Sequence, residues 1–226
     1  IDPTIDCVFK ALLGSEEHKG LLVHFLNAVL EPQDPITTVE ILNPYNEKEF
    51  QTDKLTIVDI KARNQRGELI QVEIQLANHK GLANRILHNW AELYRSTIVE
   101  GENFKKLKPA VSIWILAENL FPEVEDYHLE FEAVNRKNGL VLNDHFGIHI
   151  LQLKKWTERR IENEKERWVE FFINGKDLDE DNLPDFMKTK EMEEAMKVLK
   201  GFSDKERNYH LYLSRINAAR VEKTWK

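Results

Sequence analysis

Residues 54–76 read KLTIVDIKARNQRGELIQVEIQL, and this stretch decides the fold. β-Branched and other apolar side chains alternate with polar ones over residues 54–63 and again over residues 68–76, a pattern typical of strands. The NQRG segment between them contains residue types that turns prefer. We therefore expect a β-hairpin in this part of the chain.

The NQRG turn also predicts the register of the hairpin. Asn64 suits the first position of a type I turn, and Gly67 suits the left-handed position that follows, so a three-residue loop with a bulge at Gly67 is favoured. Counting back from the pair formed by Asn64 and Glu68 places Asp59 directly opposite Glu73. A two-residue loop would instead put these two carboxylates on opposite faces.

This register separates the hairpin side chains onto two faces. One face is apolar and suits a core: Val58, Ile60, Ala62, Ile70, Val72 and Ile74. The other face carries the polar residues with a few apolar ones: Leu55, Ile57, Asp59, Lys61, Arg63, Leu69, Gln71, Glu73 and Gln75. Asp59 and Glu73 repel each other there, and a divalent cation such as Mg²⁺, which prefers oxygen ligands, reverses the sign of that interaction.

Spacing alone also allows a second interpretation of the polar face. Lys61 and Arg63 balance the two acids on a solvated antiparallel surface, which is a common arrangement. The helix expected over residues 81–100 and the apolar run 111–117 favour a hairpin inside the sheet instead. Exposure to solvent would then not explain why this face is polar.

The remaining periodicity predicts an α/β chain. Helices are expected over residues 5–30 and 81–100. Further strands are expected over residues 36–42, 111–117, 127–135 and 147–153. Gly14-Ser15 breaks the first helical region, and Gly101 is the expected stop of the second. From Trp156 onward the pattern is helical, with Ser203 as the expected N-cap of the last helix.

The composition is that of an ordinary globular protein of 226 residues, 42% hydrophobic and 31% charged. No apolar run approaches the ~20 residues of a membrane span, so we expect no membrane partner, and the first residues do not resemble a signal peptide. The single cysteine, Cys7, excludes an internal disulfide and favours a reducing cytoplasm. The net charge of −7 argues against a passive nucleic-acid coat protein but allows phosphate binding through metal-bound acids.

Asp59, followed by Glu73-Ile74-Gln75, resembles the signature of the PD-(D/E)XK phosphodiesterase superfamily. More narrowly, the chain resembles the recombination-promoting nucleases and PD-(D/E)XK nuclease family transposases. Further segments follow that group in order: Asp6-Cys7-Val8-Phe9-Lys10, Phe25-Leu26-Asn27, Arg85, Trp90, Tyr94, Gly101, Leu107-Lys108-Pro109 and Glu206-Arg207-Asn208-Tyr209. The resemblance implies a restriction-endonuclease-like mixed sheet flanked by helices, with a nuclease-like core over residues 1–153 and a C-terminal helical extension over 154–226.

The resemblance also implies Mg²⁺-dependent cleavage of DNA, with Mn²⁺ as a substitute, linked to recombination or mobile elements. Asp59 and Glu73 would hold the metal, with the carbonyl of Ile74 as a further ligand. Gln75 stands where the superfamily signature has Lys. A glutamine can hydrogen-bond a water molecule but supplies no positive charge, which Lys61 on the same face could provide.

Other residues have two interpretations each. Asp6 either approaches the metal as an accessory acid or caps a helix or forms an ion pair. Arg85 meets DNA phosphate or the metal-binding carboxylates. Tyr94 is an accessory site residue or, as we favour, a core residue with a hydrogen-bonded hydroxyl. One basic cluster is either a DNA contact or a solvated turn: Lys105, Lys106 and Lys108.

The sequence leaves one rival function open. A nuclease-derived module that binds nucleic acid or protein but cuts slowly or not at all would keep the fold, and both Gln75 and the negative net charge favour it. DNA is the expected partner of the leading hypothesis, and a homo-oligomer is a further option.

Overall fold

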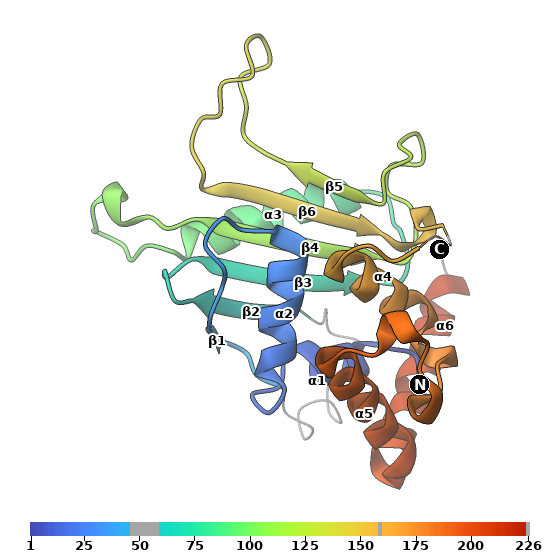
Figure 1. Cartoon of the computed structure of the whole chain (residues 1–226). Helices are drawn as coiled ribbons and strands as arrows, with labels where there is room; N and C mark the ends of the chain where they lie inside the picture. The colour runs from blue at the N-terminus through green and yellow to red at the C-terminus, as the bar shows by residue number, and fades with distance from the viewer. Residues whose placement is uncertain (46–58, 158–159, 225–226) are drawn as a thin grey trace.

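A computed structural model of the chain describes residues 1–45, 59–157 and 160–224. Within these residues a six-stranded sheet has the order β1-β2-β3-β4-β6-β5 (Figure 1). The strands are β1 (Val39–Ile41), β2 (Asp59–Asn64), β3 (Leu69–Gln75), β4 (Ala110–Leu116), β5 (His128–Phe131) and β6 (Phe146–Gln152). β3 and β6 run parallel to β4, whereas the other neighbours are antiparallel, so the sheet is mixed as expected.

The hairpin has the predicted register. The backbone N–H of Asn64 donates to the carbonyl of Glu68 at 3.1 Å, and Gly67 has a φ of +81°, the left-handed conformation that the bulge requires. Asp59 is therefore paired with Glu73 across β2 and β3. The predicted start of the first strand, including Leu55, Ile57 and Val58, lies outside the described residues.

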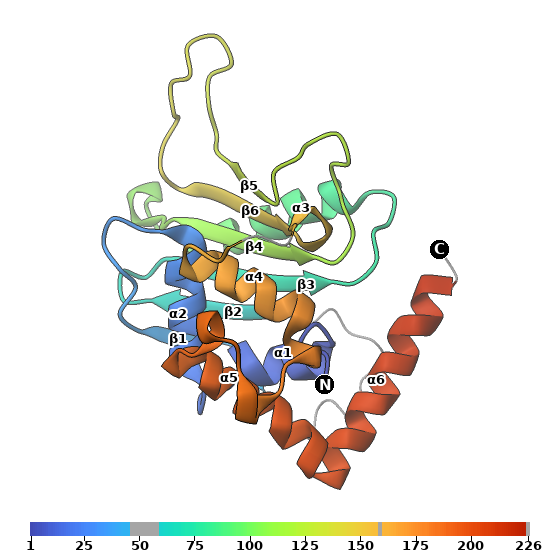
Figure 2. The ribbon, with the colours of Figure 1, turned by 45° about the vertical axis from the view of Figure 1, so that its right-hand side comes forward.

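Helices lie on both sides of the sheet (Figures 1 and 2). They are α1 (Asp6–Leu13), α2 (Lys19–Leu30), α3 (Leu82–Arg95), α4 (Glu164–Asn174), α5 (Lys190–Asp204) and α6 (Glu206–Thr224). Gly14-Ser15 separates the first two, as predicted. Two predicted helix boundaries were wrong. Helix α3 ends at Arg95, before Gly101. Ser203 is not an N-cap but lies inside α5, because the apolar stripe of α5 continues to the buried Phe202.

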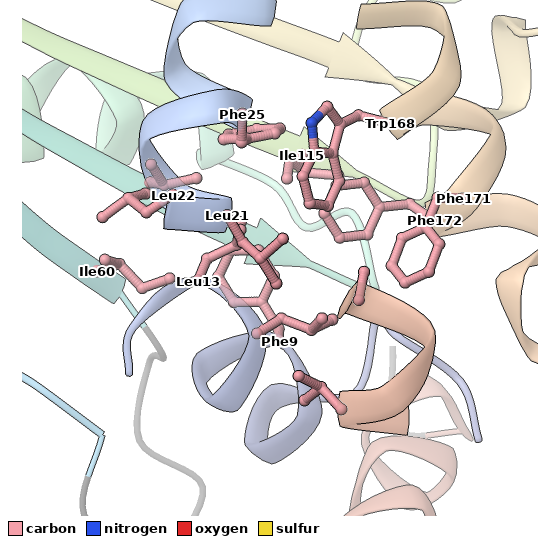
Figure 3. Close-up of a cluster of buried hydrophobic side chains, with 14 of the residues drawn as sticks. Phe9, Leu13, Leu21, Leu22, Phe25, Ile60, Ile115, Trp168, Phe171 and Phe172 are labelled. Atoms are coloured by element: carbon pink, nitrogen blue, oxygen red, sulfur yellow. The ribbon is translucent and has the colours of Figure 1, made fainter. Parts of the chain in front are cut away.

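The main core lies between the sheet and helices α1, α2, α4 and α5 (Figure 3). The rings of Phe25 on α2 and Trp168 on α4 pack in a T-shaped arrangement, with ring centroids 5.5 Å apart. Phe172, also on α4, packs against Phe9 and Phe25. The helices that follow residue 154 therefore contribute to the same core as the sheet, and the boundary at residue 153 stays a prediction.

The opposite face of the sheet is covered by α3. Leu82 and Ile86 of α3 pack against Trp114 and Ile150. The second face of the hairpin, which carries both carboxylates, points to this side because β-strand side chains alternate. None of the helices in the described part of the chain is long and apolar enough to cross a membrane.

Candidate active site

Asp59 and Glu73 face each other on neighbouring antiparallel strands, as predicted from the turn. Their environments differ: the side chain of Asp59 is 20% exposed, whereas that of Glu73 is 1% exposed. The solvated interpretation of the polar face is therefore wrong for Glu73, because α3 covers it. A carboxylate buried to this extent needs hydrogen-bond donors.

Gln71 supplies a donor to both acids. Its amide nitrogen lies 2.8 Å from Oε1 of Glu73 and 3.1 Å from Oδ2 of Asp59. Gln71 is itself 3% exposed and lies two residues before Glu73, so both side chains point to the same face of β3. The predicted register places Gln71 on this face but indicates no role for it, although a glutamine beside two acids is a signal that could have identified the donor.

Helix α3 provides two more donors to Glu73. Nη2 of Arg85 donates to Oε2 at 2.9 Å, and Nδ2 of Asn89 donates to Oε1 at 2.7 Å. Residues four apart lie on one face of a helix, which is why both reach the same carboxylate. Arg85 therefore meets the carboxylate, one of the two partners expected for it. Asn89 was missed, and its spacing from Arg85 could have indicated it.

The pKa of Glu73 is raised from its ordinary value of 4.5 to about 7. Burial is the largest cause, and the negative charge of Asp59 adds to it, whereas Asn89 and Arg85 act in the opposite direction. Glu73 therefore exchanges its proton near neutral pH. A nearby cation would favour the charged form.

Asp59 is held by Lys61 of its own strand and by Asn43. Lys61 places Nζ 3.2 Å from Oδ2 of Asp59. Asn43, which precedes β2 in the chain, donates from Nδ2 to the carbonyl of Asp59 at 3.0 Å, and its Oδ1 accepts from the backbone N–H of Lys61 at 2.7 Å. Asn43 thus fixes the backbone at both residues, a role that no local sequence pattern indicated.

Gln75 is joined to the same group of residues through Arg85. Nη1 of Arg85 lies 3.4 Å from Oε1 of Gln75, and Nε2 of Gln75 donates to the carbonyl of Ala77 at 3.1 Å. The side chain of Ile74, between Glu73 and Gln75, packs toward the main core, and the role of its carbonyl stays a prediction. Hydrogen bonds therefore connect both carboxylates and Gln75 in one network.

The residues present fit a hard divalent cation. Carboxylate oxygens of Asp59 and Glu73 share one amide hydrogen-bond donor, so they converge on a common region. In the described residues no third His, Cys, Asp or Glu joins them to form a metal-binding group. Mg²⁺ is commonly bound through one or two carboxylates and keeps several waters, so the chemistry of this pair is compatible with the ion, and metal binding stays a prediction.

Two residues expected near the site have other contacts. Oδ1 of Asp6 accepts from the backbone N–H of Cys7 at 2.7 Å, and its other oxygen lies 3.6 Å from Arg215 of α6. Burial raises the pKa of Asp6. The hydroxyl of Tyr94 lies 3.1 Å from Nδ1 of His145, which confirms the expected hydrogen bond. An accessory role for Asp6 or Tyr94 in metal binding or catalysis stays a prediction.

The basic cluster is not brought to the carboxylates. Its members lie in or just after a short 3₁₀ helix (Phe104–Lys106): Lys105, Lys106 and Lys108. They precede the start of β4, where Ala110 pairs with Leu69, whereas Glu73 pairs with Trp114. Four residues of strand place the two pairs roughly 13 Å apart. A DNA contact of these lysines stays a prediction.

The sequence matches the family model described as PD-(D/E)XK nuclease family transposase over residues 3–225. This chain belongs to that family. Members of the PD-(D/E)XK group generally use divalent metals, in agreement with the carboxylate pair. Comparisons with curated proteins and with solved structures gave no match. The family supports a nuclease or mobile-element role for the chain.

Proposed function

We propose that this PD-(D/E)XK family member is a Mg²⁺-dependent DNA endonuclease acting in recombination or on mobile elements, with Mn²⁺ able to replace Mg²⁺. The observation that carries the proposal is the buried Glu73, held opposite Asp59 by donors from two elements. Burying a carboxylate costs stability, and such a group is commonly retained for function. The proposal includes a cytoplasmic location, because the lone Cys7 is a free thiol and a reducing compartment favours free thiols.

Asp59, Glu73 and the carbonyl of Ile74 are the proposed metal ligands. When bound, the metal supplies the positive charge that stabilises phosphodiester hydrolysis at its transition state. Arg85 and Asn89 hold Glu73 in one orientation. Gln75 is the proposed group that orients the attacking water, and Lys61 adds positive charge beside Asp59.

One observation favours a second candidate, a nuclease-derived module that binds nucleic acid or protein and cuts slowly or not at all. The amide donor of Gln75 is hydrogen-bonded to the carbonyl of Ala77. One of its two amide N–H groups is thus committed to the turn at Ala77, and only the other can donate to a water molecule. The second candidate predicts DNA or protein binding without metal-dependent cleavage.

Plasmid cleavage with Mg²⁺ or Mn²⁺ tests the proposal directly. We expect the wild-type protein to cut and Asp59→Asn to lose at least about 100-fold in rate, since even an outer partner of a metal site is worth 10- to 100-fold. Asp185→Asn is the matched control, because Asp185 is exposed and pairs only locally with Lys188. Equal cutting by Asp59→Asn and the wild type would refute the assigned site.

Metal binding can be measured without cleavage. A ligand that binds only the folded state raises the melting temperature. We expect millimolar Mg²⁺ to raise it for the wild type and for Asp185→Asn but not for Asp59→Asn. DNA binding without cleavage in either metal would support the second candidate instead.

A further inference from the structure

The segment between β5 and β6 forms an arm, residues 132–145, that projects away from the sheet (Figures 1 and 2). Its two sides pair through an antiparallel bridge between Val134 and Val141. The backbone N–H of Leu142 donates to the carbonyl of Ala133 at 2.9 Å. Gly139 turns the tip with a φ of +72°. The arm is thus a two-stranded ribbon held by backbone hydrogen bonds.

The arm exposes large apolar side chains. Leu140 is 67% and Leu142 81% exposed, and Val134 and Val141 are also exposed. A two-stranded ribbon by itself is at best marginally stable in water. Because side chains alternate along paired strands, Leu140 and Leu142 lie on one face of the ribbon, and Val134 and Val141 lie on the other. Large apolar side chains exposed together on one face indicate a surface that another molecule covers.

The charges of the arm are divided between its tip and its base. Arg136 and Lys137 lie at the tip, and Glu132 and Asp144 lie at the base, all four exposed. In the described residues, Arg136, Lys137 and Glu132 form no ion pair, and Asp144 lies 3.9 Å from its neighbour His145. About 15 Å of strand separates tip from base.

We propose that the arm binds the arm of a second copy of this chain, antiparallel and related by a two-fold axis. In such a pair the same surface serves both copies. The cationic tip of each arm then meets the acidic base of the other, and the face that carries Leu140 and Leu142 is covered. A DNA duplex fits less well, because the carboxylates of Glu132 and Asp144 would face its phosphates.

The arm also continues from β5, which is an edge strand of the sheet. Edge strands are sites where a second chain commonly associates. The inference depends on the arm alone and does not require the proposed nuclease activity. Its test is therefore independent of any cleavage assay.

A charge-swap experiment tests the antiparallel pairing. The tip variant is Arg136→Glu with Lys137→Glu, and the base variant is Glu132→Lys with Asp144→Lys. Sedimentation equilibrium over about 1–100 μM measures the dimer dissociation constant. We expect a wild-type dimer and at least a tenfold weaker dimer for each variant alone. An equimolar mixture should recover dimers, because each tip then again faces a base of opposite charge.

A tagged tip variant should capture the untagged base variant but not a second tip variant. Leu140→Ser with Leu142→Ser should weaken the wild-type dimer at least tenfold and leave the circular dichroism spectrum unchanged. A wild-type protein that stays monomeric throughout this range overturns the inference. So does a mixture that recovers no dimer, or a dimer that both charge variants leave intact.

Discussion

Both faces of β3 are buried, but their side chains find different partners. Toward α2 and α4, Ile70 and Val72 belong to a continuous apolar core. Toward α3, Gln71 and Glu73 are equally buried but are surrounded by hydrogen-bond partners. Apolar burial on the first side stabilises the fold at about 25 cal/mol per Å² of surface.

Burial on the side facing α3 instead costs stability. A buried carboxylate loses its hydration, and the raised pKa of Glu73 shows that its donors replace that hydration only in part. The difference between the faces suggests that one serves stability and the other serves chemistry. Substitutions on the two faces should therefore have separable effects.

The largest expected effect is on the apolar face. Phe172→Ala removes a buried ring that contacts Phe9 and Trp168, and we expect the free energy of unfolding to fall by about 3–5 kcal/mol. Urea unfolding followed by circular dichroism measures this loss. Phe186→Ala, at an exposed position, is the control and should cost less than about 1 kcal/mol. A similarly small loss for Phe172→Ala would contradict the comparison.

Gln75→Ala tests the face of β3 that points toward α3. If Gln75 orients the attacking water, the cleavage rate should fall on the order of 100-fold while the Mg²⁺ concentration for half-maximal rate changes little. Gln75→Lys should retain or raise the rate, with an altered pH optimum. Cleavage rates against Mg²⁺ concentration for all three proteins give the answer. An unchanged rate with a lower melting temperature would show that Gln75 only holds the turn at Ala77.

The pH dependence of stability tests the burial of Glu73. Its pKa is about 7 in the folded protein and near 4.5 when unfolded, so between these values the folded state holds a proton that the unfolded chain has lost. The free energy of unfolding should therefore decrease as pH rises from about 4.5 to 7, by on the order of 1–3 kcal/mol.

Glu73→Gln is the matched control because it cannot titrate. Urea unfolding at several pH values, with a chelator present, should show the decrease in the wild type and its absence in this variant. If both proteins have the same pH profile, Glu73 has an ordinary pKa and the two faces differ less than the structure indicates.

The smallest expected effect concerns Gln71. Gln71→Ala removes the donor shared by Asp59 and Glu73, so metal-free stability should fall by about 1 kcal/mol. The melting-temperature increase caused by Mg²⁺ should become larger, because the cation then relieves a stronger repulsion. Thermal melts with and without Mg²⁺ measure both quantities. A smaller increase would instead make Gln71 part of the metal site.

Local sequence determined the hairpin and the position of its acids. The NQRG turn and the two-residue period of a strand fix which side chains face each other, because both depend on a few neighbouring residues. Asp59 opposite Glu73 followed from them. Predicted helix boundaries were less reliable. Ser203 suits an N-cap, but α5 continues past Ser203 because Phe202 is buried.

Only the tertiary structure decided which groups surround those acids. Asn89 reaches Glu73 because α3 packs across the sheet, and Asn43 reaches Asp59 from a preceding segment. These contacts depend on how whole elements pack against each other. The sequence therefore supplied the carboxylate pair, whereas packing supplied its burial, its donors and the raised pKa of Glu73.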